Sequence, residues 1–226
     1  MKAKAKYVFF DIECSNGYNI CSFGYCIFDE NLTLLEKKDI VINPESKFVL
    51  NKKGHPVNIE LAYPYEYFLK QNSFPYFYGK IKDILTNKGL TVIGHSIQSD
   101  FYFLAFACKR YHLQSIKANG YDTQKIYKEY SKSTNVASLE HILEQLNISA
   151  STLTFHKSSD DAHASFLVLK GICEKERKSF EQILQEYSHC KVDSKSIISS
   201  VNTKKKYVGL VKLKKNNKKQ LTTTLQ

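Results

Sequence analysis

The chain has 226 residues, of which 42% are hydrophobic and 13% aromatic, a composition too apolar for an intrinsically disordered protein. Its 33 lysines and arginines against 22 aspartates and glutamates give a net charge of +11, and no apolar run approaches the ~20 residues of a membrane-spanning helix. The six cysteines form no CxxC pair, so we expect them to pack as small apolar residues in a reducing compartment. The composition predicts a cytoplasmic protein with no membrane partner.

The first half of the chain predicts a sheet followed by a helix. Three stretches rich in β-branched and aromatic residues favour an antiparallel meander of strands, at residues 6–12, 20–29 and 33–42. The stretch 44–75 is aromatic and loop-rich and holds all four prolines. Apolar residues at helical spacing predict a helix over 76–88, and a short apolar strand follows at 90–94.

The second half alternates helices and strands. A helix is expected over about 98–111 and a further strand over 116–122. Ser138 is a candidate cap for the next helix. The last main helix begins near Asp160, and the apolar residues from Phe180 are expected to continue it. This order predicts an α/β fold, in which helices flank a mixed β-sheet made of an antiparallel meander plus parallel strands.

Lysines are concentrated at the C-terminus. Eight lysines and no acidic residue lie between residues 204 and 219, so this stretch carries 8 of the 11 net charges. We expect a folded domain over 1–190 and a lysine-rich tail over 191–226, within which residues 207–213 favour a short strand. Such a tail either acts as a solvated segment or attracts a polyanion such as nucleic acid.

Two acidic residues at the end of the first strand form the first candidate site. In Asp11-Ile12-Glu13 the two carboxylates point to the same face, because side chains alternate along a strand. Adjacent carboxylates repel each other unless a cation lies between them, and Mg²⁺ and Mn²⁺ prefer such oxygen ligands. On its own, the pair more often marks an exposed strand end.

Two later segments carry further acidic residues and histidines. In residues 94–100 an apolar strand runs into a polar turn, and Asp100 lies in the first turn of the next helix, where the helix dipole favours any acid. In residues 156–163 a histidine precedes the two aspartates that open the last main helix. Alone, this second segment is an exposed polar loop followed by a helix cap.

Taken together and in this order, the three segments resemble the DEDDh group of 3′–5′ exonucleases. Relatives of that group include the proofreading exonuclease of bacterial replicative DNA polymerases and several RNA-trimming enzymes. The resemblance spans roughly residues 5–176 and includes Phe74-Pro75, Tyr121-Asp122-Thr123 and the helix after Ser138. It implies a ribonuclease H-like fold, with residues 1–190 as the exonuclease domain.

The resemblance implies a catalytic role for five residues. Asp11, Glu13 and Asp161 would bind two divalent ions, Mg²⁺ or Mn²⁺, directly, and Asp100 would complete the metal site largely through a bound water. His156 would be the general base that takes a proton from the attacking water.

Neighbouring residues are distinguished from this set by their spacing. Asp160 lies four residues after His156, whereas the family's spacing is five, so Asp160 is expected to be a helix cap. His163 is expected to point elsewhere on the helix and to be non-catalytic. Asp122 is interpreted as an acid that supports the fold.

Substrate-binding residues are less clearly marked. Ile12, His95 and Ser96 are candidates for holding the terminal nucleotide, although a histidine at position 95 is also typical of a structural residue in the family. Ser96 stands where the family usually has asparagine, and Ser99 where an aromatic residue often precedes the aspartate. Aromatic residues of the proline-containing loop either stack on unpaired bases or pack within the loop; they are Tyr63, Tyr65, Tyr67 and Phe68.

The function that the resemblance implies is a metal-dependent 3′–5′ exonuclease, which releases nucleoside monophosphates from single-stranded or frayed 3′ ends. DNA is favoured by the likeness to proofreading enzymes. An RNA 3′-end-trimming exoribonuclease is the alternative, because no residue that contacts a 2′-hydroxyl can be recognised. A non-catalytic nucleic-acid-binding protein on the same scaffold is less favoured, since all five catalytic residues are present. No tethering motif identifies a polymerase or repair partner.

Overall fold

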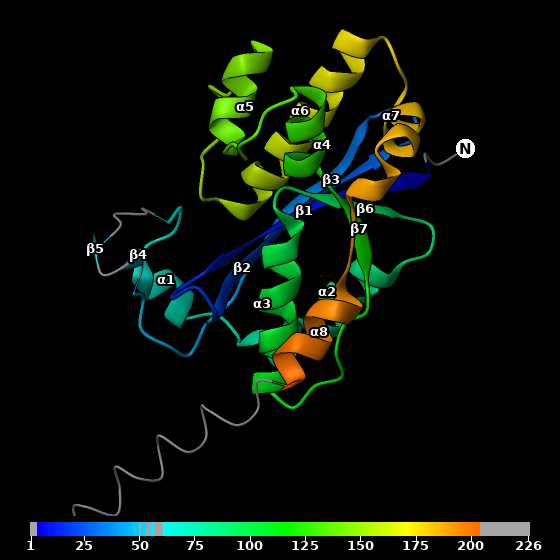
Figure 1. Cartoon of the computed structure of the whole chain (residues 1–226). Helices are drawn as coiled ribbons and strands as arrows, with labels where there is room; N and C mark the ends of the chain where they lie inside the picture. The colour runs from blue at the N-terminus through cyan, green and yellow to red at the C-terminus, as the bar shows by residue number, and fades with distance from the viewer. Residues whose placement is uncertain (1–3, 50, 53–54, 57–60, 204–226) are drawn as a thin grey trace, which may run out of the picture.

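Six strands form one mixed sheet at the centre of the molecule. The computed structural model describes residues 4–49, 51–52, 55–56 and 61–203, and the strand order in the sheet is β3-β2-β1-β6-β7-β8 (Figure 1). The strands are β1 (Ala5–Cys14), β2 (Ile20–Asp29), β3 (Leu34–Val41), β6 (Thr91–Gly94), β7 (Asn119–Asp122) and β8 (Lys191–Asp193). The short strands β4 (Asn51–Lys52) and β5 (His55–Pro56) pair separately.

The strand directions confirm the expected α/β fold. β1, β2 and β3 pair antiparallel, as the short connections between them predicted. β6 pairs parallel to β1, β7 parallel to β6, and β8 antiparallel to β7 at the edge. Because β1, β6 and β7 run in the same direction, their carboxyl ends lie at one edge of the sheet.

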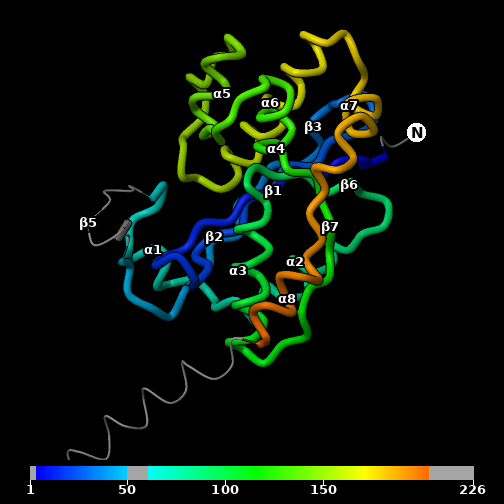
Figure 2. The backbone as a smooth tube through the Cα atoms, in the orientation of Figure 1, coloured from blue at the N-terminus to red at the C-terminus, as the bar shows by residue number. Residues whose placement is uncertain are grey.

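Helices cover both faces of the sheet, so the chain folds into three layers (Figures 1 and 2). One core lies between the sheet and α2 (Phe74–Thr86), α3 (Ile97–Arg110) and α8 (Ser194–Thr203). The other lies between the sheet and α4 (Thr123–Tyr130), α5 (Leu139–Leu146), α6 (Ser158–Glu176) and α7 (Phe180–Glu186). A short helix α1 (Tyr65–Leu69) and a 3₁₀ turn η1 (Ser188–Cys190) complete the described elements.

The central strand β1 supplies side chains to both cores in alternation. Val8 and Phe10 are buried in the core that contains α3, and Phe9 is buried in the core that contains α6. The same alternation directs Asp11 and Glu13 to the α6 face, at the carboxyl end of the strand. One strand therefore builds the core and presents the first two acids.

The last main helix ends earlier than the sequence predicted. α6 stops at Arg177, whose φ of 54° is left-handed, and α7 begins as a separate helix. Ser179 and Gln182 form a capping box at the start of α7, in which each side chain accepts a hydrogen bond from the other residue's amide. The expectation of one continued helix was wrong, because this capping box begins a new helix axis.

The expected domain boundary at residue 190 is too early. β8 pairs with β7, and α8 packs on α3, where Lys109 Nζ donates a hydrogen bond to the carbonyl of Val201 at 2.6 Å. The folded domain therefore extends at least to Thr203. The lysine-rich residues from 204 onward, with the expected strand at 207–213, lie outside the described residues.

Within the described ranges, no helix has the length and apolar character that crossing a membrane requires. All six cysteines are buried and carry free thiols, in agreement with the expectation that they pack as small apolar residues.

Candidate active site

The three acidic segments of the sequence come together at the carboxyl edge of the sheet. Asp11 and Glu13 lie near the end of β1, Asp100 lies in the first turn of α3, and Asp161 lies in the first turn of α6. Asp11 interacts electrostatically with the other three carboxylates. His156 lies in the loop before α6, with its Nδ1 3.4 Å from Glu13 Oε1. The structure thus groups all five expected catalytic residues.

Helix α6 reaches this edge because β2 has a glycine where the two elements meet. Gly24 pairs with Asp11 in the register of β1 and β2. A Cβ atom at Gly24 would lie 2.0 Å from the Ser158 carbonyl carbon and 2.0 Å from the Ser159 amide nitrogen. Only glycine allows this approach of backbone to backbone, which brings Asp161 next to β1.

A carboxylate on β3 holds the start of α6 from the other side. Asp39 accepts hydrogen bonds from the amide and from the hydroxyl of Ser159, both at 2.8 Å. It also accepts one from the Tyr63 hydroxyl at 2.9 Å. The first amides of a helix have no partner within the helix, so a carboxylate there is stabilising.

Sequence reasoning missed the residues that position α6. Gly24 carried the one usable signal, because a glycine inside a strand pattern often marks a close backbone approach. Asp39 and Ser159 are polar residues without a motif, and they are separated by 120 positions. Their contact could not be inferred from local spacing.

Burial and mutual repulsion change the acidity of the cluster. Burial, followed by the neighbouring carboxylates, raises the pKa of Asp11 and the pKa of Asp100 well above their ordinary values. For Asp161, burial and then Glu13 raise the pKa to about 7. Carboxyl groups in this situation either keep a proton or bind a cation in its place.

His156 is oriented by two contacts with the cluster. Its backbone is left-handed, with a φ of 63°, and its amide donates a hydrogen bond to Asp161 Oδ2 at 3.0 Å. The contact of its imidazole with Glu13 raises the pKa of His156, although burial opposes the shift. The side chain is 46% exposed, so the ring is held on one side and open to solvent on the other.

The donor atoms of the cluster fit a divalent cation. Asp11 Oδ2, Asp100 Oδ2 and Asp161 Oδ1 are buried without a hydrogen-bond partner. Unpartnered buried carboxylate oxygens cost free energy that a bound cation offsets. Glu13, His156 and Asp161 also offer ligand atoms that all lie within 4.8 Å of one another. Such a predominantly oxygen donor set suits Mg²⁺ and Mn²⁺.

Asp160 and His163 lie apart from the carboxylate group. Asp160 forms an ion pair with Lys37, and its Oδ2 accepts a hydrogen bond from the Thr154 amide at 3.0 Å. These contacts outweigh burial and lower the pKa of Asp160. The His163 ring stacks on Phe166, with ring centroids 5.9 Å apart. His163 thus packs against the aromatic core, which agrees with the expectation that it points elsewhere on the helix.

His95 belongs to a buried polar network. Its Nδ1 lies 3.1 Å from Thr123 Oγ1, and its Nε2 lies 3.1 Å from the carbonyl oxygen of Ala137. Burial lowers the pKa of His95 to about 4, so the ring is neutral near pH 7. Both ring nitrogens therefore face partners inside the protein.

Asp122 and Ser96 connect β7 to the start of α3. Asp122 caps α4 and also accepts a hydrogen bond from the Ser96 amide at 3.0 Å. Its interpretation as an acid that supports the fold is confirmed. Ser96 is the left-handed N-cap of α3, and Ile12 is buried in the core. Nucleotide binding by Ile12, His95 or Ser96 stays a prediction.

The aromatic residues of the loop before α2 divide into two groups. Phe68 is buried, and Tyr63 is tied to Asp39 by its hydroxyl group. Tyr65 and Tyr67 are 47% and 44% exposed. Packing within the loop therefore accounts for the first pair, whereas the second pair presents accessible ring surface.

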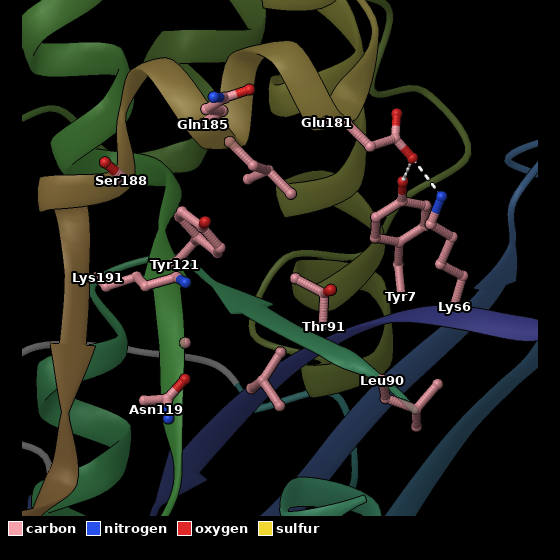
Figure 3. Close-up of a pocket in the computed structure, with 13 residues that line it drawn as sticks. Lys6, Tyr7, Leu90, Thr91, Asn119, Tyr121, Glu181, Gln185, Ser188 and Lys191 are labelled. Atoms are coloured by element: carbon pink, nitrogen blue, oxygen red, sulfur yellow. Dashed lines mark hydrogen bonds and ion pairs between the residues drawn. The ribbon is translucent and has the colours of Figure 1, made fainter. Parts of the chain in front are cut away.

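A separate pocket lies at the opposite edge of the sheet (Figure 3). It has a volume of about 460 Å³ and is lined by the first residues of β1, β6 and β7 and by α7. At its rim, Lys6 and the Tyr7 hydroxyl both contact the Glu181 carboxylate. None of the expected catalytic residues lines it, so this pocket is separate from the candidate active site.

Comparison with known proteins finds one family model that matches part of the chain. The sequence profile DEDDh_C, described as DNA polymerase III subunit epsilon-like, C-terminal domain, matches residues 68–172. A search of curated proteins finds no match to the sequence.

Several solved structures share the fold. The nuclease domain of 3′hExo, a DEDDh family member bound to rAMP, superposes with a TM-score of 0.57 at 15% identity, over 77% of this chain and 94% of that chain. A 3′-exonuclease that recognises the histone mRNA stem-loop gives a TM-score of 0.59 at 13% identity, over 77% of this chain and 65% of that chain. E. coli exonuclease I in complex with a dA16 oligonucleotide gives a TM-score of 0.54 at 14% identity, over 78% of this chain and 42% of that chain.

The sheet order and the helices on both faces form the ribonuclease H-like fold that these solved exonucleases share. The match over residues 68–172 is to a DEDDh family model, and the fold is shared by DEDDh exonucleases.

Proposed function

We propose that this chain is a metal-dependent 3′–5′ exonuclease that releases nucleoside monophosphates from single-stranded or frayed 3′ ends. The observation that carries the proposal is the convergence of four carboxylates and His156, with three carboxylate oxygens buried and unpartnered. A protein that only binds nucleic acid has no need to keep such a costly cluster of like charges.

Each acid has a proposed role in this reaction. Asp11, Glu13 and Asp161 would hold two divalent ions, Mg²⁺ or Mn²⁺, and Asp100 would complete the site. When bound, such ions supply an activated water and charge stabilisation for the leaving 3′ oxygen. The contribution of the chain is rigid placement, because β1 fixes two of the carboxylates and the first turns of α3 and α6 fix the others.

His156 is the proposed general base. Its Nδ1 faces Glu13, so Nε2 of the neutral ring is the nitrogen that accepts a proton from the attacking water. The exposed side of the ring then returns this proton to solvent. The hydrogen bond from the His156 amide to Asp161 keeps the base in register with the metal-binding acids.

The placement of α6 can be tested at Gly24, a residue that has no functional side chain. Gly24→Ala must displace the first turn of α6, since the new Cβ would clash with its backbone. We expect a loss of ~1–3 kcal/mol in the free energy of unfolding. Nucleotide release should fall by ~10²-fold, because misplacement of ~1 Å is enough for such a loss. Urea unfolding and release from a 5′-labelled oligonucleotide measure the two effects.

Gly79→Ala is the matched control for this substitution. A Cβ at Gly79, inside α2, meets no atom within 4 Å. This variant should gain ~0.5–1 kcal/mol from the better helix propensity of alanine and keep full activity. Equal activity of the two variants would show that the close approach of α6 to β2 is not needed for catalysis.

DNA is the substrate that we propose first, and RNA is the second candidate. The profile match to DNA polymerase III epsilon-like proteins and the likeness to exonuclease I with dA16 favour DNA. The likeness to 3′hExo bound to rAMP favours RNA. Matched 3′-labelled and 5′-labelled DNA and RNA oligonucleotides, with Mg²⁺ or Mn²⁺, distinguish these substrates. Immediate release of label from the 3′ end supports an exonuclease. Binding of the DNA and RNA oligonucleotides without release of label would instead indicate a non-catalytic nucleic-acid-binding protein on this scaffold.

The lysine-rich residues after Thr203 are proposed to capture the substrate and to leave the chemical step unchanged. A chain that ends at Thr203 keeps every described element and lacks eight lysines. Its nucleic-acid affinity should fall, and the slope of log affinity against log salt should become shallower by fewer than ~8 units. Salt titrations of nucleic-acid affinity and melting curves, for the full and the truncated chain, measure the change in slope and the integrity of the fold. An unchanged salt slope in a folded truncated chain contradicts the proposal.

A further inference from the structure

A second group of metal-binding side chains lies outside the carboxylate cluster. Glu129 lies near the end of α4, and His189 and Cys190 form part of the turn η1, which leads directly into β8. Their ligand atoms all lie within 4.8 Å of one another. The described residues contain one other group that meets the same criterion, and it belongs to the candidate active site.

The Glu129 carboxylate lies between the other two side chains. Its Oε2 contacts His189 Nε2, and its Oε1 accepts from Cys190 Sγ at 3.6 Å. With metal–nitrogen distances of ~2.0 Å and metal–sulfur distances of ~2.3 Å, the ligand atoms of a tetrahedral site lie roughly 3.3–3.8 Å apart. The Glu129–Cys190 distance falls in this range, whereas Glu129 and His189 lie closer together and need only move apart slightly to share an ion.

The proposed ligands differ in their exposure to solvent. Cys190 is 1% exposed, whereas the side chains of His189 and Glu129 are 58% and 46% exposed. An ion can therefore enter from solvent, and a water can supply the fourth ligand. Imidazole nitrogen, carboxylate oxygen and thiolate sulfur together suit a borderline-soft ion more than Mg²⁺.

We propose that Glu129, His189 and Cys190 form a Zn²⁺ site that joins η1 and the start of β8 to α4. Binding breaks the S–H bond of Cys190, releases the proton to solvent and forms a zinc–thiolate bond. Two of its residues, His189 and Cys190, follow α7 and precede the edge strand β8, whereas Glu129 lies on α4. It is independent of the proposed nuclease reaction, because it shares no residue with that site.

Burial and the Glu129 carboxylate raise the pKa of the Cys190 thiol to about 12, so the thiol keeps its proton until a metal displaces it. Cys173 is also buried and has Glu174 nearby, but it has no histidine partner in either metal-binding group. Cys173 therefore serves as the matched control cysteine.

Titration with Co²⁺, a spectroscopic substitute for Zn²⁺, tests the site. Thiolate-bound Co²⁺ gives a charge-transfer absorption in the near ultraviolet, and the carboxylate cluster of the candidate active site contains no sulfur ligand. We expect the full chain to show this band, one equivalent of Zn²⁺ to abolish it, and Cys190→Ser to lack it. Cys173→Ser should keep the band.

His189→Asn provides a second variant at an exposed position, where folding is not at risk. It should weaken Co²⁺ binding at least tenfold while circular dichroism stays unchanged. A wild-type chain without the band, or a band that persists in Cys190→Ser, overturns the proposal. The three residues would then form only a hydrogen-bonded cluster around Glu129.

Discussion

Asp11→Asn should abolish nucleotide release and, at the same time, raise the melting temperature of the metal-free protein. Asp11 interacts with Asp100, Glu13 and Asp161, and burial raises its pKa further. An amide in its place removes one buried like charge from the group. Since ~1 kcal/mol shifts the melting temperature of a domain of this size by ~2–4 °C, we expect a gain of at least ~3 °C in EDTA.

The same substitution removes a proposed metal ligand. Loss of residues that merely support a metal ligand costs ~10–100-fold in activity, so loss of a direct ligand should exceed ~10²-fold. Asp83→Asn, at an exposed acid on α2, is the control and should change neither quantity. Melting in EDTA and nucleotide release with saturating Mg²⁺ measure the two effects. Undiminished release by Asp11→Asn, or a lower melting temperature, contradicts the proposed site.

The metal-free wild type should also lose stability as the pH rises. The pKa of Asp161 is raised on folding from 3.8 to about 7, so between these values the folded state binds more protons than the unfolded state. The free energy of unfolding therefore falls as the pH rises through this window, in the absence of ions. Saturating Mg²⁺ should flatten the dependence, because the ions then neutralise the carboxylates. Urea unfolding at several pH values, with EDTA or Mg²⁺, tests this.

His156→Ala should slow turnover by ~10²–10⁴-fold, the usual contribution of a general base. Its effect on Mn²⁺ affinity should be small, because the oxygens of Asp11, Asp100 and Asp161 remain in place. The wild-type rate should rise with pH through the pKa of His156, which the contact with Glu13 raises above its ordinary value of 6.5. The alanine variant should show a weaker rise.

His163→Ala is the control for this prediction. His163 lies only two residues after Asp161, yet its ring stacks on Phe166 in the core. Its removal should lower the melting temperature and leave the turnover number nearly unchanged. Single-turnover rates and Mn²⁺ titrations of both variants make the comparison. A larger loss of turnover in His163→Ala would show that the histidine of the motif has been misassigned.

Sequence patterns were sufficient to predict features that depend on residues close together in the chain. Alternation along a strand directs Asp11 and Glu13 to one face. The five-residue spacing from His156 to Asp161 selects Asp161 as the candidate ligand. Asp160 is not the expected helix cap, because Lys157 is the N-cap residue and Asp160 pairs with Lys37. Strands of residues with high β-propensity and the helix capped by Ser138 were predicted for the same reason.

Elements with weak local signals were missed or misjudged. β8 has three residues and α8 is rich in serine, so neither presents a long apolar period, and the boundary was expected at residue 190. Both elements form because β7 offers a free edge and α3 offers a packing surface. The end of α6 depends on the left-handed backbone of Arg177, which helical periodicity does not reveal.

The residue types that could perform the chemistry can be recognised along the chain, because strand alternation, helix periodicity and short motif spacing are local properties. How these residues meet depends on contacts between segments that are distant in the sequence. Gly24 meets the backbone of Ser158, Asp39 meets Ser159, and Glu129 meets Cys190. These contacts join residues more than 60 positions apart, since Glu129 and Cys190 are separated by 61 and the other pairs by more. No period along the chain encodes such separations, because they arise only when packed layers bring distant segments together.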